Sequence, residues 1–211
     1  MIKALLLIFF PEWAWERVVR NQRSFAFILV LHLLPLLALG SLGEGYGLAH
    51  WGKLQKDGFY SKKFAASEAT VFEIEQALLG LGIVLFGARI LKSLGETFHG
   101  RHTYTQAFTV VAYGLSPLFM SRLACALPSV SPWVGWAAWA IGILLSLEVL
   151  YKGMPRVMQP DPPHAFGLYF TSALLLVIAT GLAQFVAAWY LQGRFKSLDA
   201  IVSALASRLP F

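Results

Sequence analysis

Long stretches without a charged residue constrain this chain more than any other feature of its sequence. Four such stretches occur, of 20, 20, 25 and 32 residues. A helix of about 20 residues crosses the roughly 30 Å of hydrocarbon in a bilayer, so each stretch can hold a membrane span. The sequence therefore predicts a polytopic membrane protein. The stretches lie between Arg23 and Glu44, Arg101 and Arg122, Arg122 and Glu148, and Asp161 and Arg194.

Composition excludes several classes of soluble protein. The 211 residues are 57% hydrophobic and 13% charged, whereas globular domains carry about 25% charged residues. The net charge of +6 is scattered between apolar segments and forms no basic run or face of the kind that binds nucleic acid. We therefore expect membrane lipids, and no nucleic acid, to contact the protein. A single cysteine, Cys125, excludes an internal disulfide and a cysteine-based metal cage.

Five membrane-spanning helices are predicted, so the expected fold class is an all-α membrane bundle. The second span is the least obvious, because charged residues leave only a short apolar run between Glu75 and Arg89. Spacings of three and four nevertheless place Glu73, Gly80 and Gly87 on one helical face, and faces of small residues pack inside bundles. The predicted spans are residues 25–42, 71–91, 102–126, 133–151 and 165–191.

The segments on either side of the five-span domain, residues 24–191, are predicted to be amphipathic. Residues 1–23 contain an expected interfacial helix from Pro11 to Arg23, with its acidic residues early and its arginines late. The carboxy-terminal tail, residues 192–211, has apolar residues at helical spacing and is expected to be a second interfacial helix.

Glycine and proline clusters predict where the spans end or bend. Glycines from Gly40 to Gly47 are expected to end the first span. Gly114 and Pro117 predict a kink in the third span. Four prolines in residues 152–163 predict a turn region that ends the fourth span and stiffens the approach to the fifth.

Polar residues form a stripe along the third span. Gln106, Thr109, Tyr113 and Ser116 recur at spacings of three, four and three, so they share one side of an otherwise apolar helix. Such a stripe must face protein or water. Two interpretations remain open, namely hydrogen bonding between helices and the wall of a hydrophilic cavity for a lipid headgroup or small solute.

Charged residues near the span ends predict intramembrane ion pairs. The second span enters from the side on which Arg122 lies, so Glu73 is expected to pair with Arg122. Glu148 lies toward the opposite side, where it is expected to form a helix-end ion pair. Its expected partner is one of Arg89, Lys92 and Arg101.

Histidines give weak support for a metal site. His99 and His102 are three residues apart, and His164 is expected on the same side of the membrane. No carboxylate accompanies them at a diagnostic spacing, so we interpret them as solvated loop residues and expect neither a metal nor a cofactor.

Two short motifs occur in the second half of the chain, one reading Tyr-Gly-Leu-Ser-Pro and the other Tyr-Lys-Gly-Met-Pro. The motif residues are Tyr113, Gly114, Ser116, Pro117, Tyr151, Gly153 and Pro155. With the stretch around them, residues 93–186, they resemble the Yip domain family, the Ypt/Rab-interacting membrane proteins and their bacterial relatives.

The resemblance implies a five-helix membrane protein with a cytoplasmic amino terminus. Family members in eukaryotes are tied to vesicle traffic and Rab-type GTPases through a long amino-terminal region. Only about two dozen residues precede the first span here, so binding of Rab-type GTPases is not expected. The chain resembles a compact bacterial-type member, which implies the bacterial inner membrane.

These features favour a non-enzymatic membrane protein that acts by helix-mediated association with itself or with other membrane proteins, in membrane organisation or a trafficking-like role. The alternative is a small transporter or lipid-handling protein whose cavity is lined by the third span. A membrane enzyme ranks third, because the sequence contains no nucleophile elbow, zinc-binding helix motif or phosphate-binding glycine loop.

Overall fold

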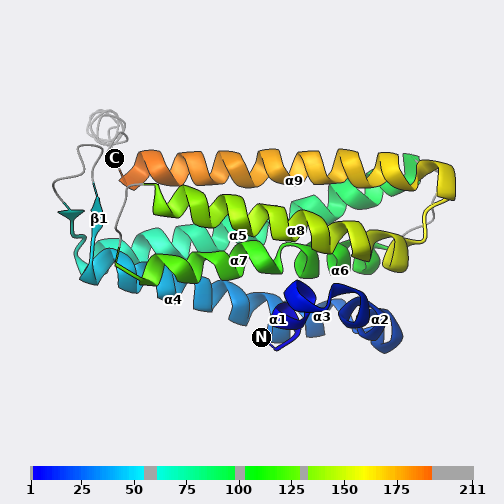
Figure 1. Cartoon of the computed structure of the whole chain (residues 1–211), viewed down its shortest axis with the longest axis horizontal. Coiled ribbons are helices and arrows are strands. Elements are labelled where there is room, and N and C mark those ends of the chain that lie inside the picture. The colour runs from blue at the N-terminus through cyan, green and yellow to red at the C-terminus, as the bar shows by residue number, and fades with distance from the viewer. Residues whose placement is uncertain (1, 55–60, 98–102, 129–132, 192–211) are drawn as a thin grey trace, which may run out of the picture.

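The computed structural model describes residues 2–54, 61–97, 103–128 and 133–191, and it confirms the all-α fold class (Figure 1). A two-stranded antiparallel hairpin, with Lys53 opposite Lys62, is attached at one end of the helical bundle. The elements in chain order are α1 (Ile2–Phe9), α2 (Pro11–Asn21), α3 (Phe25–Ile28), a π-helical turn (Leu29–Leu33), α4 (Leu34–His50), β1 (Lys53–Leu54), β2 (Ser61–Lys62), α5 (Ala66–Thr97), α6 (Tyr104–Gly114), α7 (Ser116–Ser121), a 3₁₀ turn (Arg122–Ala126), α8 (Val134–Met158) and α9 (Pro162–Leu191).

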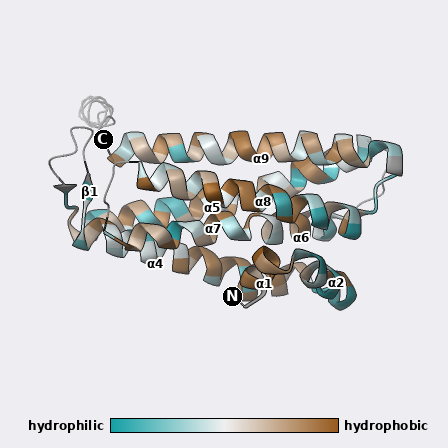
Figure 2. Ribbon diagram, viewed as in Figure 1, coloured by the Kyte–Doolittle hydropathy of each residue, from teal (hydrophilic) through white to brown (hydrophobic). Residues whose placement is uncertain are grey.

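Within the described ranges, five helical segments are long and apolar enough to cross a membrane, as the sequence predicted. They lie side by side in Figure 1, and Figure 2 shows apolar residues along the middle of the bundle and more polar ones toward its ends. The third span is central. Of its most apolar 18 residues 67% are buried, whereas the corresponding share in the other four spans is 22–33%. The other spans therefore surround it and face lipid.

The first span is longer than predicted, because its glycines do not end it. The helix continues through Gly40, Gly43 and Gly47 to His50. A side chain at Gly47 would collide with the carbonyl oxygen of Cys125, and one at Gly43 would meet Leu123 at 2.8 Å. These glycines bring α4 against the 3₁₀ turn, which is the usual role of small residues between membrane helices.

The third span bends at the predicted place. Thr103 and Gln106 form a capping box at its start, and α6 ends at Gly114 while α7 begins at Ser116. Pro117 falls in the first turn of α7, where its missing N–H costs no helical hydrogen bond. The break leaves the Leu118 amide to donate to Ser146 Oγ at 3.2 Å.

The fourth span also runs further than predicted, to Met158 rather than residue 151. Pro155 lies inside its last turns and removes one backbone donor. That loss is tolerated close to the helix end, where Arg156 Nη1 donates to the neighbouring Lys152 carbonyl at 2.6 Å. The helix ends at Gln159, which adopts a left-handed conformation with φ 44°.

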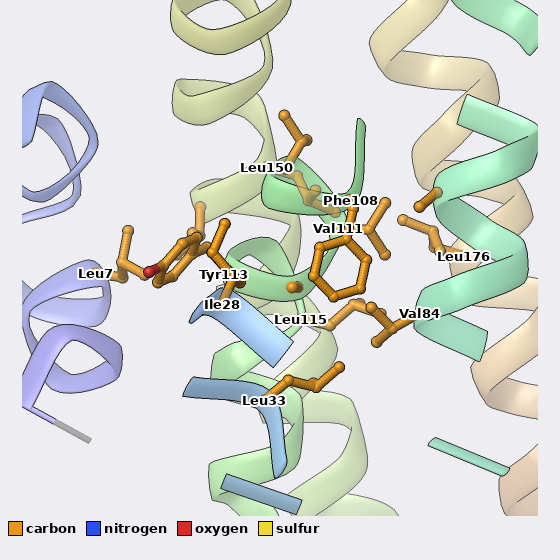
Figure 3. Packing of buried hydrophobic residues seen from close by; sticks show 14 of the residues in the cluster. Leu7, Ile28, Leu33, Val84, Phe108, Val111, Tyr113, Leu115, Leu150 and Leu176 are labelled. Atoms are coloured by element: carbon orange, nitrogen blue, oxygen red, sulfur yellow. The ribbon is translucent and has the colours of Figure 1, made fainter. Parts of the chain in front are cut away.

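The amino-terminal helices lie against the bundle rather than only on the membrane surface. Ala4 and Leu7 of α1 are fully buried, and Figure 3 shows Leu7 beside Tyr113 of the third span. Trp15 of α2 is also fully buried and donates from Nε1 to the Val149 carbonyl at 2.9 Å. The predicted interfacial helix in residues 192–211 lies outside the described residues.

Candidate functional site

Tyr113 is the centre of a buried aromatic cluster. The residue is 1% exposed, and its ring lies 4.1 Å from the ring of His32 and meets Trp15 edge to face at 6.1 Å between centroids. These three residues come from the third span, the first span and α2. The cluster therefore fixes the amino-terminal segment to the centre of the bundle.

His32 is a buried histidine held by a hydrogen bond. Its Nε2 lies 2.9 Å from Ser116 Oγ, and the Ser116 hydroxyl donates to the Ala112 carbonyl at 3.1 Å. Ser116 has one hydroxyl proton for these two contacts, so the tautomer of His32 with its proton on Nε2 donates to Oγ while the serine donates to Ala112. His32 lies in the π-helical turn Leu29–Leu33, whose wider turn is a feature found often at functional positions in helices.

Glycines at two motif positions admit the neighbours of this cluster. A side chain at Gly153 would collide with the indole ring of Trp15, and one at Gly114 would collide with the side chain of Leu150. Glycine is needed at both positions because α8 approaches α2 closely at Gly153 and α6 closely at Gly114. Tyr151, by contrast, is exposed and meets Tyr169 edge to face at 5.2 Å between centroids.

The polar stripe of the third span divides into two parts with different surroundings. Tyr113 and Ser116 are buried within the His32 cluster. Gln106 and Thr109 instead line a pocket of about 380 Å³ near the amino end of α6. Contacts between helices therefore account for Tyr113 and Ser116, whereas Gln106 and Thr109 form part of the wall of a pocket.

Arg122 holds two carboxylates from two different helices. Its Nη2 lies 2.7 Å from Glu73 Oε2 of α5, and its Nε lies 2.8 Å from Glu44 Oε2 of α4. The three side chains are largely buried, with exposed fractions of 18% for Arg122, 7% for Glu73 and 16% for Glu44. The cluster thus ties three spans together, and Glu73 Oε1 is buried without a hydrogen-bond partner in the described part of the chain.

Sequence reasoning paired Arg122 with Glu73 and missed Glu44. The missed signal is positional, because Gly40, Glu44 and Gly47 are spaced four and three apart and share the face of α4 that meets the 3₁₀ turn. A carboxylate between glycines on a contact face must find a partner. This face was missed because the glycines were expected to end the helix, whereas α4 continues through them to His50.

Glu148 pairs with a residue of its own helix, and neither Arg89 nor Lys92 is its partner in the described part of the chain. Glu148 Oε1 binds Lys152 Nζ at 3.0 Å, one helical turn along α8, with an exposed carboxylate. A partner at i+4 is reached at little entropic cost, whereas Arg89 and Lys92 lie on another helix and Lys92 binds Glu96 at 3.3 Å. Arg101, His99 and His102 lie outside the described residues.

A comparison with protein-family models shows to which family the chain belongs. The model described as the Yip1 domain matches residues 5–185. The chain belongs to the Yip1 domain family. The match is wider than the motif-bearing region that suggested it, and it includes most of α1, α2 and all but the last residues of α9. No curated protein and no solved structure matched the chain.

The motif residues lie within the matched domain. Members of the family are generally non-enzymatic membrane proteins. Within the Yip1 domain, Tyr113, Gly114 and Gly153 surround Trp15 and the α6–α7 break. Their role in this structure is to assemble the bundle. The more open surfaces of the domain lie elsewhere.

One of these surfaces is an apolar groove of about 660 Å³ between α5 and α9. It extends from Glu75 to Leu94 along α5, which corresponds to about 28 Å at 1.5 Å per residue, close to the thickness of the hydrocarbon core. Gly82 lines it, and a Cβ there would meet no atom within 4 Å. Ser172 also lines it, 3% exposed, with a hydroxyl that has no hydrogen-bond partner among the residues described.

Proposed function

We propose that this Yip1-domain protein is non-enzymatic and organises membranes by self-association, with the α5–α9 groove receiving a transmembrane helix of a second copy. The observation that carries the proposal is the groove itself, which runs the depth of the bilayer and is lined by apolar side chains. A filled bundle centre supports the same conclusion, because the third span is buried around Tyr113.

The groove contains a feature that favours helix association in lipid. Gly82 and Ala179 are small residues that let another backbone approach closely. The oxygen of Ser172 has almost no accessible surface, so an incoming helix gains close packing at the small residues rather than a hydrogen bond from Ser172.

Another face of α9 carries a ridge that fits such a groove. Large apolar side chains recur every four residues on the exposed, outer side of α9. Two copies inserted with the same orientation and related by a twofold axis along the membrane normal can each place this ridge in the other's groove, as an isologous interface requires. The ridge residues are Phe166, Phe170, Leu174, Ile178 and Leu182, all exposed.

Counting copies in a bilayer tests the proposal. The purified protein, labelled with one dye per chain, is reconstituted at high lipid dilution and its photobleaching steps are counted. We expect two steps for the wild type and one for Gly82→Leu, because the leucine fills the groove from a position whose Cβ has no neighbour within 4 Å. Overfilling a packed interface costs about 1–3 kcal/mol, which lowers the dimerisation constant about 5- to 150-fold.

Gly135→Leu is the matched control. A Cβ at Gly135 of α8 has only Gln184 Nε2 near it among the described residues, at 4.0 Å, and Gly135 does not line the groove. This variant should dimerise like the wild type. A monomeric wild type, or equal dimerisation of all three proteins, contradicts self-association through the groove.

The proposal also assigns an orientation, with the amino terminus in the cytoplasm and the chain in a bacterial inner membrane. It is supported by the likeness to compact bacterial-type members, and the five spans require the two ends to lie on opposite sides. Reporter fusions after residue 54 and after residue 97 should report opposite sides, with the second fusion cytoplasmic. A periplasmic second fusion would overturn the orientation.

A further inference from the structure

A pocket of about 380 Å³ opens at the end of the bundle where α2 finishes and α6 begins. Its polar walls come from the α2–α3 link, Gln22 to Ser24, and from the first turns of α6, Thr103 to Thr109. Valines of α2 and α8 complete it. The α2–α3 link, the start of α6 and the end of α8 meet here, and Figure 1 shows α2 and the start of α6 toward the same end of the bundle. The pocket therefore lies at the level of lipid headgroups.

The lining is rich in hydrogen-bond donors. Arg23 lines the pocket, and its guanidinium stacks 4.5 Å from the Phe27 ring without a carboxylate partner among the described residues. Gln22, Ser24 and Thr105 add an amide and two hydroxyls. None of the lining residues that the structure describes is acidic. An anion is the class of ligand that such a lining favours.

Gln106 is oriented as a donor by its own helix. Its Oε1 accepts from the Thr103 amide at 2.9 Å and from the Thr103 hydroxyl at 3.0 Å. The capping box thus uses the oxygen of the side chain and directs the Nε2 amide group, with its two N–H donors, away from Thr103. Since Gln106 lines the pocket, these two donors are available to a ligand.

We propose that this pocket binds a phosphate group, with Arg23 and the Gln106 amide as its principal donors. Phosphate accepts several hydrogen bonds at once and pairs well with a planar guanidinium. The amino end of α6 adds a favourable dipole. A phospholipid headgroup and free inorganic phosphate share this chemistry, and the position of the pocket at headgroup level makes the lipid the natural source.

Gln106→Glu is the sharpest variant. Glutamate keeps the oxygen that caps α6, so the helix retains its first turn, while both donors are replaced by a negative charge. Arg23→Gln removes the cation. Arg20→Gln is the matched control, because Arg20 is an exposed arginine near the end of α2 that does not line the pocket.

The test measures the thermal unfolding midpoint of the detergent-purified protein during titration with dioleoylphosphatidic acid, with dioleoylglycerol, which has the same chains and no phosphate, and with inorganic phosphate. We expect the phosphatidic acid to stabilise the wild type and Arg20→Gln equally, and to bind Gln106→Glu and Arg23→Gln at least about tenfold more weakly, the effect of losing one charge-assisted contact. Stabilisation by phosphatidic acid alone identifies the lipid headgroup as ligand, and equal stabilisation by inorganic phosphate identifies the free anion.

Two results would overturn the assignment. In the first, dioleoylglycerol stabilises the wild type as well as phosphatidic acid does, so the effect comes from acyl chains. In the second, Arg20→Gln loses as much binding as Arg23→Gln while Gln106→Glu loses none, so the effect is general surface charge. Without added ligand, the midpoint of Gln106→Glu should equal that of the wild type, which separates loss of binding from loss of fold.

Discussion

Replacing Arg122 should destabilise the bundle more than the loss of any other ion pair in the described part of the chain. Arg122→Ala removes charge-assisted hydrogen bonds of 2.7 and 2.8 Å and leaves two carboxylates next to each other without a cation. The side chain of Glu73 is only 7% exposed, so water cannot replace the lost partner. Removing one partner of a buried pair costs about 3–5 kcal/mol, and we expect a loss in that range.

A second substitution separates the ion pair from the lost volume of the arginine. In the Arg122→Ala background, Glu73→Gln removes the uncompensated buried charge and should restore about 1–2 kcal/mol, roughly the desolvation penalty that an unpaired buried group carries. Arg122→Lys should fall between the wild type and Arg122→Ala, because one ammonium group cannot reproduce the fork that reaches both carboxylates.

Equilibrium unfolding in mixed micelles of dodecylmaltoside and sodium dodecyl sulfate, followed by tryptophan fluorescence, measures these differences. Lys92→Ala serves as the control, because Lys92 binds Glu96 at 3.3 Å with side chains 40% and 56% exposed, and exposed pairs contribute at most about 1 kcal/mol. Two outcomes refute the reasoning. Either Arg122→Ala costs no more than the control, or adding Glu73→Gln leaves the double variant no more stable than Arg122→Ala.

Two further predictions concern glycines. Gly153→Ala should displace the indole of Trp15 from its site, cost about 1–3 kcal/mol as overpacked substitutions do, and shift tryptophan emission to the red; unchanged emission would show that α2 is not held there. Gly47→Ala should prevent close approach of α4 to the backbone at Cys125 and lower the unfolding midpoint sharply, whereas Gly82→Ala, whose Cβ meets nothing within 4 Å, should leave it unchanged or raise it. Equal effects of Gly47→Ala and Gly82→Ala would argue against the α4 contact.

The span count could be predicted from sequence because charge is excluded from hydrocarbon by a large free-energy cost. The second span illustrates this, since helical spacing placed Glu73 and Gly80 on a buried face despite the nearby charges, and both are buried in the structure. Proline and glycine chemistry likewise located the break between Gly114 and Ser116. These are local properties, which a single sequence records.

The errors have a common physical origin in contacts between distant segments. Glycines can end a helix, but in a membrane helix they also allow another backbone to pack closely against it. Only the structure shows that the 3₁₀ turn lies against Gly47. The same holds for Glu44, whose partner Arg122 is 78 residues away. The α5–α9 groove has no sequence signature, because lipid-facing and groove-lining leucines look alike.

Disulfide formation between two copies tests the central claim of self-association most directly. In a Cys125→Ala background, chains with Gly82→Cys, in the groove, are mixed in one bilayer with chains carrying Ile178→Cys, on the α9 ridge, and oxidised. We predict a disulfide-linked dimer from this mixture and none when Ile178→Cys is replaced by Ile141→Cys, an exposed lipid-facing position on α8. Absence of the dimer from the first mixture, or equal yields from both, would contradict the proposal that the groove receives a second copy.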